Sequence, residues 1–144
     1  MPRVSKFLLR DKQIKEISSH LHYLISLLNN ENEISNFLGN FLTKEEKLML
    51  SKRLVLLMML KRQYSPSAIK NILHVSYETI RIYQNQLNSK NEIFEKILKK
   101  ILQRQKTKEL FDKINKFLKP IDLAMRSKTN MRARAKFASG NWFE

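Results

Sequence analysis

Six polar or charged side chains between residues 77 and 85 are of types that hydrogen-bond to nucleic acid. They are Tyr77, Glu78, Thr79, Arg81, Gln84 and Asn85. Guanidinium, amide and hydroxyl groups bind base edges in the major groove and phosphate oxygens along the backbone, and a carboxylate can accept a hydrogen bond from a base edge. Apolar side chains recur between them at helical spacing, at Ile80, Tyr83 and Leu87. One helix would therefore bury the apolar side chains and present the polar ones outward.

The stretch from 65 to 87 predicts two short helices around a three-residue turn. Ser65 and Ser76 are placed to cap the two helices, and Pro66 stands at the first helical position, where its missing N–H costs nothing. His74 begins the turn at a position where glycine is common; a non-glycine residue with a positive φ carries strain, so His74 in that conformation would be a tolerated departure. This is the spacing of a DNA-binding helix-turn-helix, although a plain corner between two helices of an all-helical protein gives the same pattern.

We expect the polar side chains of this helix-turn-helix to contact different parts of DNA. Arg81 and Gln84 are predicted to contact bases, because guanidinium and amide groups can bind a base edge with two hydrogen bonds. Lys70, Thr79 and Asn85 are predicted to contact phosphates. Ser67, on the first helix, belongs to the same predicted DNA-binding surface.

The chain carries a strong excess of positive charge. Twenty-eight Lys and Arg against thirteen Asp and Glu give a formal net charge of +15 over 144 residues. The excess is larger in residues 89–144, with fifteen basic and six acidic side chains, than in residues 1–88, with thirteen and seven. Such a charge favours a polyanionic partner, nucleic acid first, while an anionic membrane or an acidic protein would also be compatible.

Composition predicts an all-α protein. Two Gly and three Pro provide little turn chemistry for a sheet, and 42% hydrophobic residues suffice for one core. The chain has no Cys, which excludes disulfides and Cys-based zinc sites. The longest apolar run, Leu54–Leu60, is too short to span a bilayer, and residues 1–10 hold no signal-like apolar segment. We therefore expect no membrane partner, and a cytoplasmic, nucleoid-associated protein.

Apolar periodicity predicts three helices before the helix-turn-helix, over 11–29, 32–41 and 44–62. The first two are amphipathic. The third is apolar around much of its circumference, chiefly through the run from 54 to 60. One small domain has too few other helices to bury the apolar side chains on all sides of such a helix. This predicts a homodimer, in which the second subunit buries the rest.

Two Ser/Thr-x-x-Glu spacings predict capping boxes. Thr43 with Glu46 would start the 44–62 helix, and Ser89 with Glu92 would start a helix after the helix-turn-helix. A further helix is expected to end at Pro120, because proline lacks the backbone donor that a helix interior uses.

Periodicity fades toward the C-terminus. We divide the chain into a helical DNA-binding and dimerisation domain over 1–120 and a basic, flexible tail over 121–144. Five basic side chains lie in a tail segment without acidic residues, at Arg126, Lys128, Arg132, Arg134 and Lys136. We expect them to contact phosphates, either from a flexible arm or from a helix that forms on the polyanion. The alternatives are a solubilising tail and docking of the terminal aromatic residues on the core.

Several short motifs between Leu42 and Leu98 fit one known family. They are the Leu-Thr start followed by Glu46, the arginine at position 53, the Ile69-Lys70-Asn71 step and the Thr79-Ile80 pair. Through them the chain resembles the bacterial Trp repressor family and its shorter helix-turn-helix relatives. The resemblance implies a multi-helix bundle in which the N-terminal helices of two subunits interlock into an intertwined homodimer.

The resemblance also implies where a ligand would bind. That family holds free tryptophan between its long central helix and its recognition helix through two arginines. Arg53 matches the first arginine, while Ile82 stands at the second and Tyr83 at the glycine beside it. We therefore expect no cofactor and no tryptophan control, with the Tyr83 ring filling the ligand's place.

No constellation of catalytic or metal-binding residues is evident in the sequence. His20 and His22 lie two apart on a predicted helix and so point in different directions, which is poor geometry for one metal ion. No glycine-rich phosphate loop is present, and Glu45 and Glu46 suit the start of a helix. We expect neither an enzyme nor a metal protein.

The sequence therefore predicts a homodimeric transcriptional regulator that binds double-stranded DNA through the helix-turn-helix at 65–87. Two alternatives stay open. One is a low-specificity architectural or mobile-element DNA-binding protein, which the basic surface would serve. The other is an RNA-associated factor that docks through its helical core.

Overall fold

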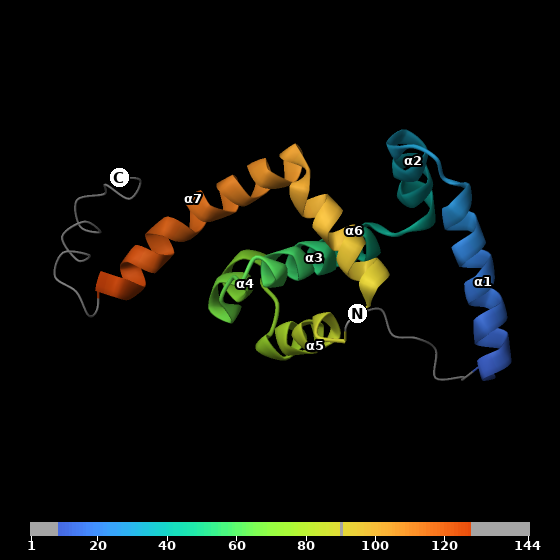
Figure 1. Ribbon diagram of the computed structural model, residues 1–144, viewed down its shortest axis with the longest axis horizontal. Coiled ribbons are helices and arrows are strands. Elements are labelled where there is room, and N and C mark those ends of the chain that lie inside the picture. Colours follow the sequence, from blue (N-terminus) through green and yellow to red (C-terminus); the bar gives the residue numbers. More distant parts are fainter. Residues whose placement is uncertain (1–8, 90, 128–144) are drawn as a thin grey trace. The chain divides into compact units, whose positions relative to one another are not determined.

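The computed structural model describes residues 9–89 and 91–127, with side chains described as far as Ile121, and every regular element in that part is a helix. The helices are α1 (Asp11–Leu27), α2 (Glu31–Phe41), α3 (Lys44–Lys61), α4 (Pro66–Leu73), α5 (Tyr77–Leu87), α6 (Glu92–Gln103) and α7 (Gln105–Ser127) (Figure 1). The prediction of an all-α protein is confirmed. None of these helices is both long enough and apolar enough to cross a membrane.

The chain divides into two compact units, residues 1–54 and residues 55–144, so the division falls inside α3. In the first unit, neither α1 nor α2 contains a buried residue. Their apolar side chains are exposed instead, among them Ile14, Ile17, Leu21, Ile25, Ile34 and Phe41. The amphipathic stripes predicted for these helices therefore lie uncovered in the described chain.

Local hydrogen bonds explain where α2 and α3 begin. Asn30 caps α2, its Oδ1 accepting from the backbone N–H of Glu33 at 2.9 Å. Thr43 and Glu46 form the predicted capping box before α3. The Thr43 N–H donates to Glu46 Oε2 at 2.9 Å, and the Glu46 N–H donates to Thr43 Oγ1 at 3.2 Å.

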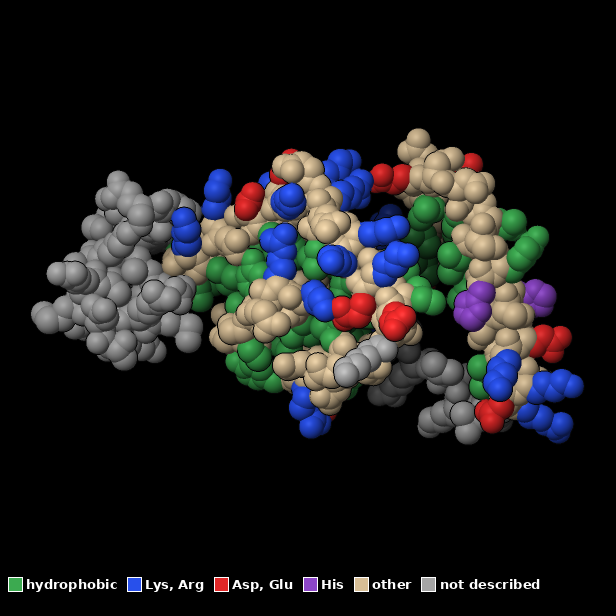
Figure 2. Space-filling view, in the orientation of Figure 1, with side chains coloured by type: hydrophobic (Ala, Val, Ile, Leu, Met, Phe, Trp, Pro, Cys, Tyr) green, Lys and Arg blue, Asp and Glu red, His purple; other side chains and the backbone are tan. Residues whose placement is uncertain are grey.

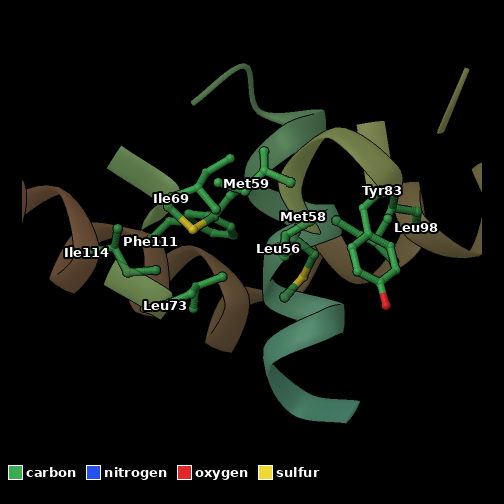
Figure 3. Packing of buried hydrophobic residues seen from close by; sticks show 11 residues of the cluster. Leu56, Met58, Met59, Ile69, Leu73, Tyr83, Leu98, Phe111 and Ile114 are labelled. Atoms are coloured by element: carbon green, nitrogen blue, oxygen red, sulfur yellow. The ribbon is translucent and has the colours of Figure 1, made fainter. Parts of the chain in front are cut away.

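The second unit has a hydrophobic core to which α3, α4, α5, α6 and α7 all contribute. Its buried members are Leu56, Leu57, Met58, Met59, Ile69, Leu73, Ile80, Tyr83, Leu98, Phe111 and Ile114 (Figure 3). An ion pair between Lys61 and Glu95 joins α3 to α6 at the edge of this core.

Four consecutive residues of α3, 56–59, are all buried. Successive helical residues point about 100° apart, so this turn of α3 is surrounded by α4 to α7 of its own chain. Our argument that the 54–60 run needs a second subunit for cover is therefore wrong for these four residues. Much of the exposed apolar surface lies earlier, on α1, on α2 and at Leu48 and Leu50 of α3, and further exposed apolar side chains lie on α6 and α7, among them Ile93, Ile97 and Phe117.

Two helix ends differ from the prediction. Asn91 caps α6, its Oδ1 accepting from the N–H of Phe94 at 3.1 Å, whereas the Ser89 hydroxyl bonds back to the Gln86 carbonyl at the end of α5. Helix α7 continues through Pro120 to Ser127. Proline removes one helical hydrogen bond, and half-buried Leu118 packs this part of α7 against the core. The helix thus crosses the boundary that we predicted at 120/121.

Candidate nucleic-acid interface

Helices α4 and α5 have the capped starts predicted for a helix-turn-helix. Ser65 Oγ accepts from the N–H of Ala68 at 3.2 Å, and Ser76 Oγ accepts from the N–H of Thr79 at 3.1 Å. Pro66 occupies the first turn of α4, where it costs no hydrogen bond. Both predicted caps are confirmed.

The turn between these helices depends on His74. This residue takes the left-handed conformation, with φ 52° and ψ 49°, and its N–H donates to the Lys70 carbonyl at 2.9 Å. A side chain in this conformation costs about 1–2 kcal/mol, since its Cβ crowds the following carbonyl oxygen. His74 thus adopts the positive φ that glycine commonly takes at this position, and the turn stores some strain.

The inner faces of α4 and α5 belong to the core. Ile69 and Leu73 of α4 are buried, as are Ile80 and Tyr83 of α5. Figure 3 shows Ile69, Leu73 and Tyr83 among the buried side chains of the other helices. The second helix of the pair is therefore fixed by packing, and its outer face has a defined orientation.

Five of the six residues singled out between 77 and 85 lie on that outer face and are exposed: Tyr77, Glu78, Arg81, Gln84 and Asn85. Thr79 differs, because it is half-buried and its hydroxyl lies 2.9 Å from Ser76 Oγ. The structure thus brings together most of the predicted DNA-binding residues of α5 and holds Thr79 at the helix cap.

Arg81 is held by Glu78 through a two-bond ion pair. Arg81 Nη2 donates to Glu78 Oε1 at 2.7 Å, and Arg81 Nε donates to Oε2 at 3.1 Å. The hydrogen bond from Arg81 lowers the pKa of the Glu78 carboxyl. Two parallel bonds orient the guanidinium plane and leave its other N–H groups for a further partner. Our sequence reasoning missed this pair, although the i, i+3 spacing of Glu and Arg on a helix signals it.

Lys70 links the two helices on the same surface. Its Nζ lies 4.6 Å from the centroid of the Tyr77 ring, a cation–π distance. Both side chains are exposed. The ammonium group of the predicted phosphate-binding lysine, on α4, therefore lies beside Tyr77, the first residue of α5.

Helix α7 contacts the segment between α3 and α4 through side chains that the sequence did not predict. Phe111 is fully buried, with the Tyr64 ring 5.7 Å and the Arg62 guanidinium carbon 4.1 Å from its centroid. The Tyr64 hydroxyl donates to Asn115 Oδ1. Burial raises the pKa of the Tyr64 hydroxyl, and neighbouring Arg62 offsets part of that rise. These contacts join residues about fifty positions apart, which no local pattern signals.

The positions that the family resemblance marked for a ligand have distinct environments. Tyr83 is 7% exposed and part of the core, whereas Ile82 is 55% exposed. Arg53 is half-buried on α3. Within the described residues, no group of three or more His, Cys, Asp and Glu side chains could hold a metal ion.

The basic residues of the predicted tail fall beyond the side chains that the structure describes. They are Arg126, Lys128, Arg132, Arg134 and Lys136. Their predicted phosphate contacts, and the flexibility predicted for this segment, stay predictions.

Comparison with known proteins identifies one family. No curated protein and no solved structure matches the chain. A family model described as the Trp repressor protein matches residues 16–102, a range that contains the whole helix-turn-helix and ends before α7. This range covers more than half of the chain and confirms the resemblance seen in the sequence: the protein belongs to the Trp repressor family.

Proposed function

We propose that the protein is a homodimeric transcriptional regulator that binds double-stranded DNA, with α5 in the major groove. The outer face of α5 carries this proposal, because it presents five exposed hydrogen-bonding side chains on a helix whose inner face is buried. A single helix of this kind fits the major groove. Membership of the Trp repressor family supports a DNA-binding helix-turn-helix regulator.

The exposed residues take different roles in this proposal. Arg81 and Gln84 contact base edges, with guanine the natural partner of the arginine and adenine that of the glutamine. Lys70 and Asn85 contact phosphates, which position α5 without selecting a sequence. The basic residues between 126 and 136 add further phosphate contacts.

The dimer forms through the first unit. Neither α1 nor α2 contains a buried residue, and covering their exposed apolar surface with a partner would stabilise the protein by about 25 cal/mol for each Å² buried. A second copy of α1, α2 and the start of α3 supplies matching apolar stripes. Two recognition helices related by two-fold symmetry then meet half-sites about one helical turn apart.

Tryptophan does not control this regulator. Ile82 cannot replace the charge-assisted hydrogen bond of an arginine, typically worth about 1.5–3 kcal/mol, and the buried Tyr83 ring supplies apolar packing beside it. We expect calorimetric titration with L-tryptophan to show no binding heat, and its addition to leave DNA affinity unchanged. Binding at physiological tryptophan concentrations would contradict this part of the proposal.

Selection from a pool of random duplexes tests the proposal directly. A two-fold symmetric consensus is the expected result. Strong binding without any consensus would favour the low-specificity architectural protein. The excess of basic over acidic side chains in residues 89–144 supports that alternative. Tighter binding to RNA than to duplex DNA would favour the RNA-associated factor.

A further inference from the structure

A groove of about 340 Å³ lies between α4, the first helix of the helix-turn-helix, and α7. Its polar lining comes from both helices and the residue before α4: Ser65, Ser67, Asn71, Asn115 and Lys119. Phe111 fixes α7 to the core, and Tyr64 fixes Asn115, so the α7 wall of the groove is anchored at two points.

The groove's surface is mainly apolar, from Tyr64, Ala68, Leu118 and Ile121, while its polar side chains include no carboxylate and can donate hydrogen bonds. Lys119 is exposed and forms no ion pair within the described residues. The oxygen of the Asn115 amide accepts from Tyr64, which leaves the amide N–H groups as donors. An ammonium group, amide N–H groups and serine hydroxyls together suit an anion with several oxygens, of which a phosphate group is the common biological case.

This groove is continuous with the proposed DNA-binding surface. Ser67 lines it and lies one helical turn from Lys70, whose Nζ contacts the Tyr77 ring of α5. Several Lys and Arg side chains also lie on the visible face of α6 and α7 (Figure 2). A DNA strand held by Lys70 therefore has positively charged protein on the α7 side as well.

We infer that this groove binds a phosphodiester of the DNA backbone next to the base pairs that α5 contacts. Lys119 provides the positive charge, and Ser67, Asn71 and Asn115 donate hydrogen bonds. The inference rests on the proposed DNA-binding function. It adds a contact from α7, an element beyond residues 16–102 that match the family model.

Lys119→Gln tests the inference against Lys113→Gln as a matched control. Both substitutions remove one positive charge from an exposed position of α7, but Lys113 does not line the groove. Affinity for one selected duplex is measured over a range of salt concentrations. We expect the slope of log K against log salt to become shallower by about 0.9 for Lys119→Gln relative to the control, with equal loss on preferred and random sequences.

Asn115→Asp gives a second readout. Aspartate keeps an oxygen that can accept from Tyr64, so thermal unfolding should match the wild type, while its charge should repel a phosphate and weaken binding more than Lys119→Gln does. Equal slopes and affinities for Lys119→Gln and Lys113→Gln would overturn the inference and leave the proposed function intact. Failure of the wild type to bind any duplex would overturn the proposed function itself.

Discussion

In the proposed function, Arg81 discriminates between bases only while its guanidinium keeps one orientation, and the ion pair with Glu78 holds that orientation. The pair is exposed, with 69% of the Arg81 side chain and 62% of the Glu78 side chain accessible, so it adds little to stability. We propose that the pair serves instead to present a fixed donor edge of the guanidinium toward the major groove. This role would explain an acidic residue on the outer face of α5, where a carboxylate beside DNA phosphates is otherwise unfavourable.

Arg81→Ala should cost sequence specificity. If Arg81 binds guanine, its loss weakens the preferred site by about 1–3 kcal/mol and leaves binding to random DNA nearly unchanged. Glu78→Gln should lose discrimination at the same base pair, with no additional loss in the double variant. Fluorescence anisotropy with preferred and single-base-changed duplexes measures both. Tighter binding of Glu78→Gln to every sequence would mean that Glu78 only competes with DNA for Arg81.

Tyr64 should make the second unit less stable at alkaline pH. Because burial raises the pKa of its hydroxyl above the ordinary value of about 10, the folded state holds the phenolic proton more tightly than the unfolded state does. This contribution is present below about pH 10 and is lost as the pH rises beyond it. Tyr64→Phe should remove that pH dependence and, at neutral pH, lower the free energy of unfolding by about 0.5–1 kcal/mol through the lost bond to Asn115.

Denaturant unfolding at pH 8 and above pH 10 compares Tyr64→Phe with Tyr23→Phe. Tyr23 is 66% exposed, so the same chemical change there should leave the pH dependence of the wild type in place. A Tyr64→Phe protein that loses stability with pH as steeply as the wild type would contradict the assignment.

At the scale of elements, the turn between α4 and α5 is the strained part of the helix-turn-helix. His74→Gly should raise the free energy of unfolding by about 0.5–1 kcal/mol, because glycine adopts φ 52° without a Cβ clash. The larger conformational entropy of glycine in the unfolded chain offsets part of this gain. His20→Gly, in the exposed interior of α1, should instead destabilise by about 0.5–1 kcal/mol. Thermal or denaturant unfolding decides, and a less stable His74→Gly would argue against strain at the turn.

At the scale of the whole molecule, the two units differ in how much apolar surface each buries by itself. Residues 55–144 contain a core of their own, while residues 1–54 expose Ile17, Leu21 and Ile25 along one stripe of α1. A unit that buries no side chain of α1 or α2 gains little hydrophobic stabilisation alone. Its stability should therefore depend on association.

Sedimentation should show a dimer at micromolar concentration. Ile17→Asp, on the apolar stripe, should dissociate it, because a charge there would have to be buried in the interface. Ser19→Asp places the same charge on the opposite, polar side of α1 and should leave the dimer intact. A well-folded wild-type monomer at that concentration would rule out the interlocked dimer.

Much of the fold follows from local sequence, since its determinants act within three or four residues. Ser65, Ser76 and Thr43 each bond a backbone N–H three positions on, and the left-handed turn at His74 is expected from its place between two helices. The exposed polar face of α5 follows from helical periodicity. These short-range rules sufficed for the all-α class and for the two capped helices at 65–87, whereas the family followed from the resemblance of motifs between Leu42 and Leu98.

Tertiary structure decided which apolar surfaces are covered and which polar groups meet. Residues 56–59 are enclosed by their own chain whereas Leu48 and Leu50 of the same helix are exposed, a difference that hydrophobicity along the helix does not contain. The bond from Tyr64 to Asn115 and the continuation of α7 past Pro120 likewise depend on packing between distant segments. Periodicity states that a face is apolar; only the arrangement of the other helices determines what covers it.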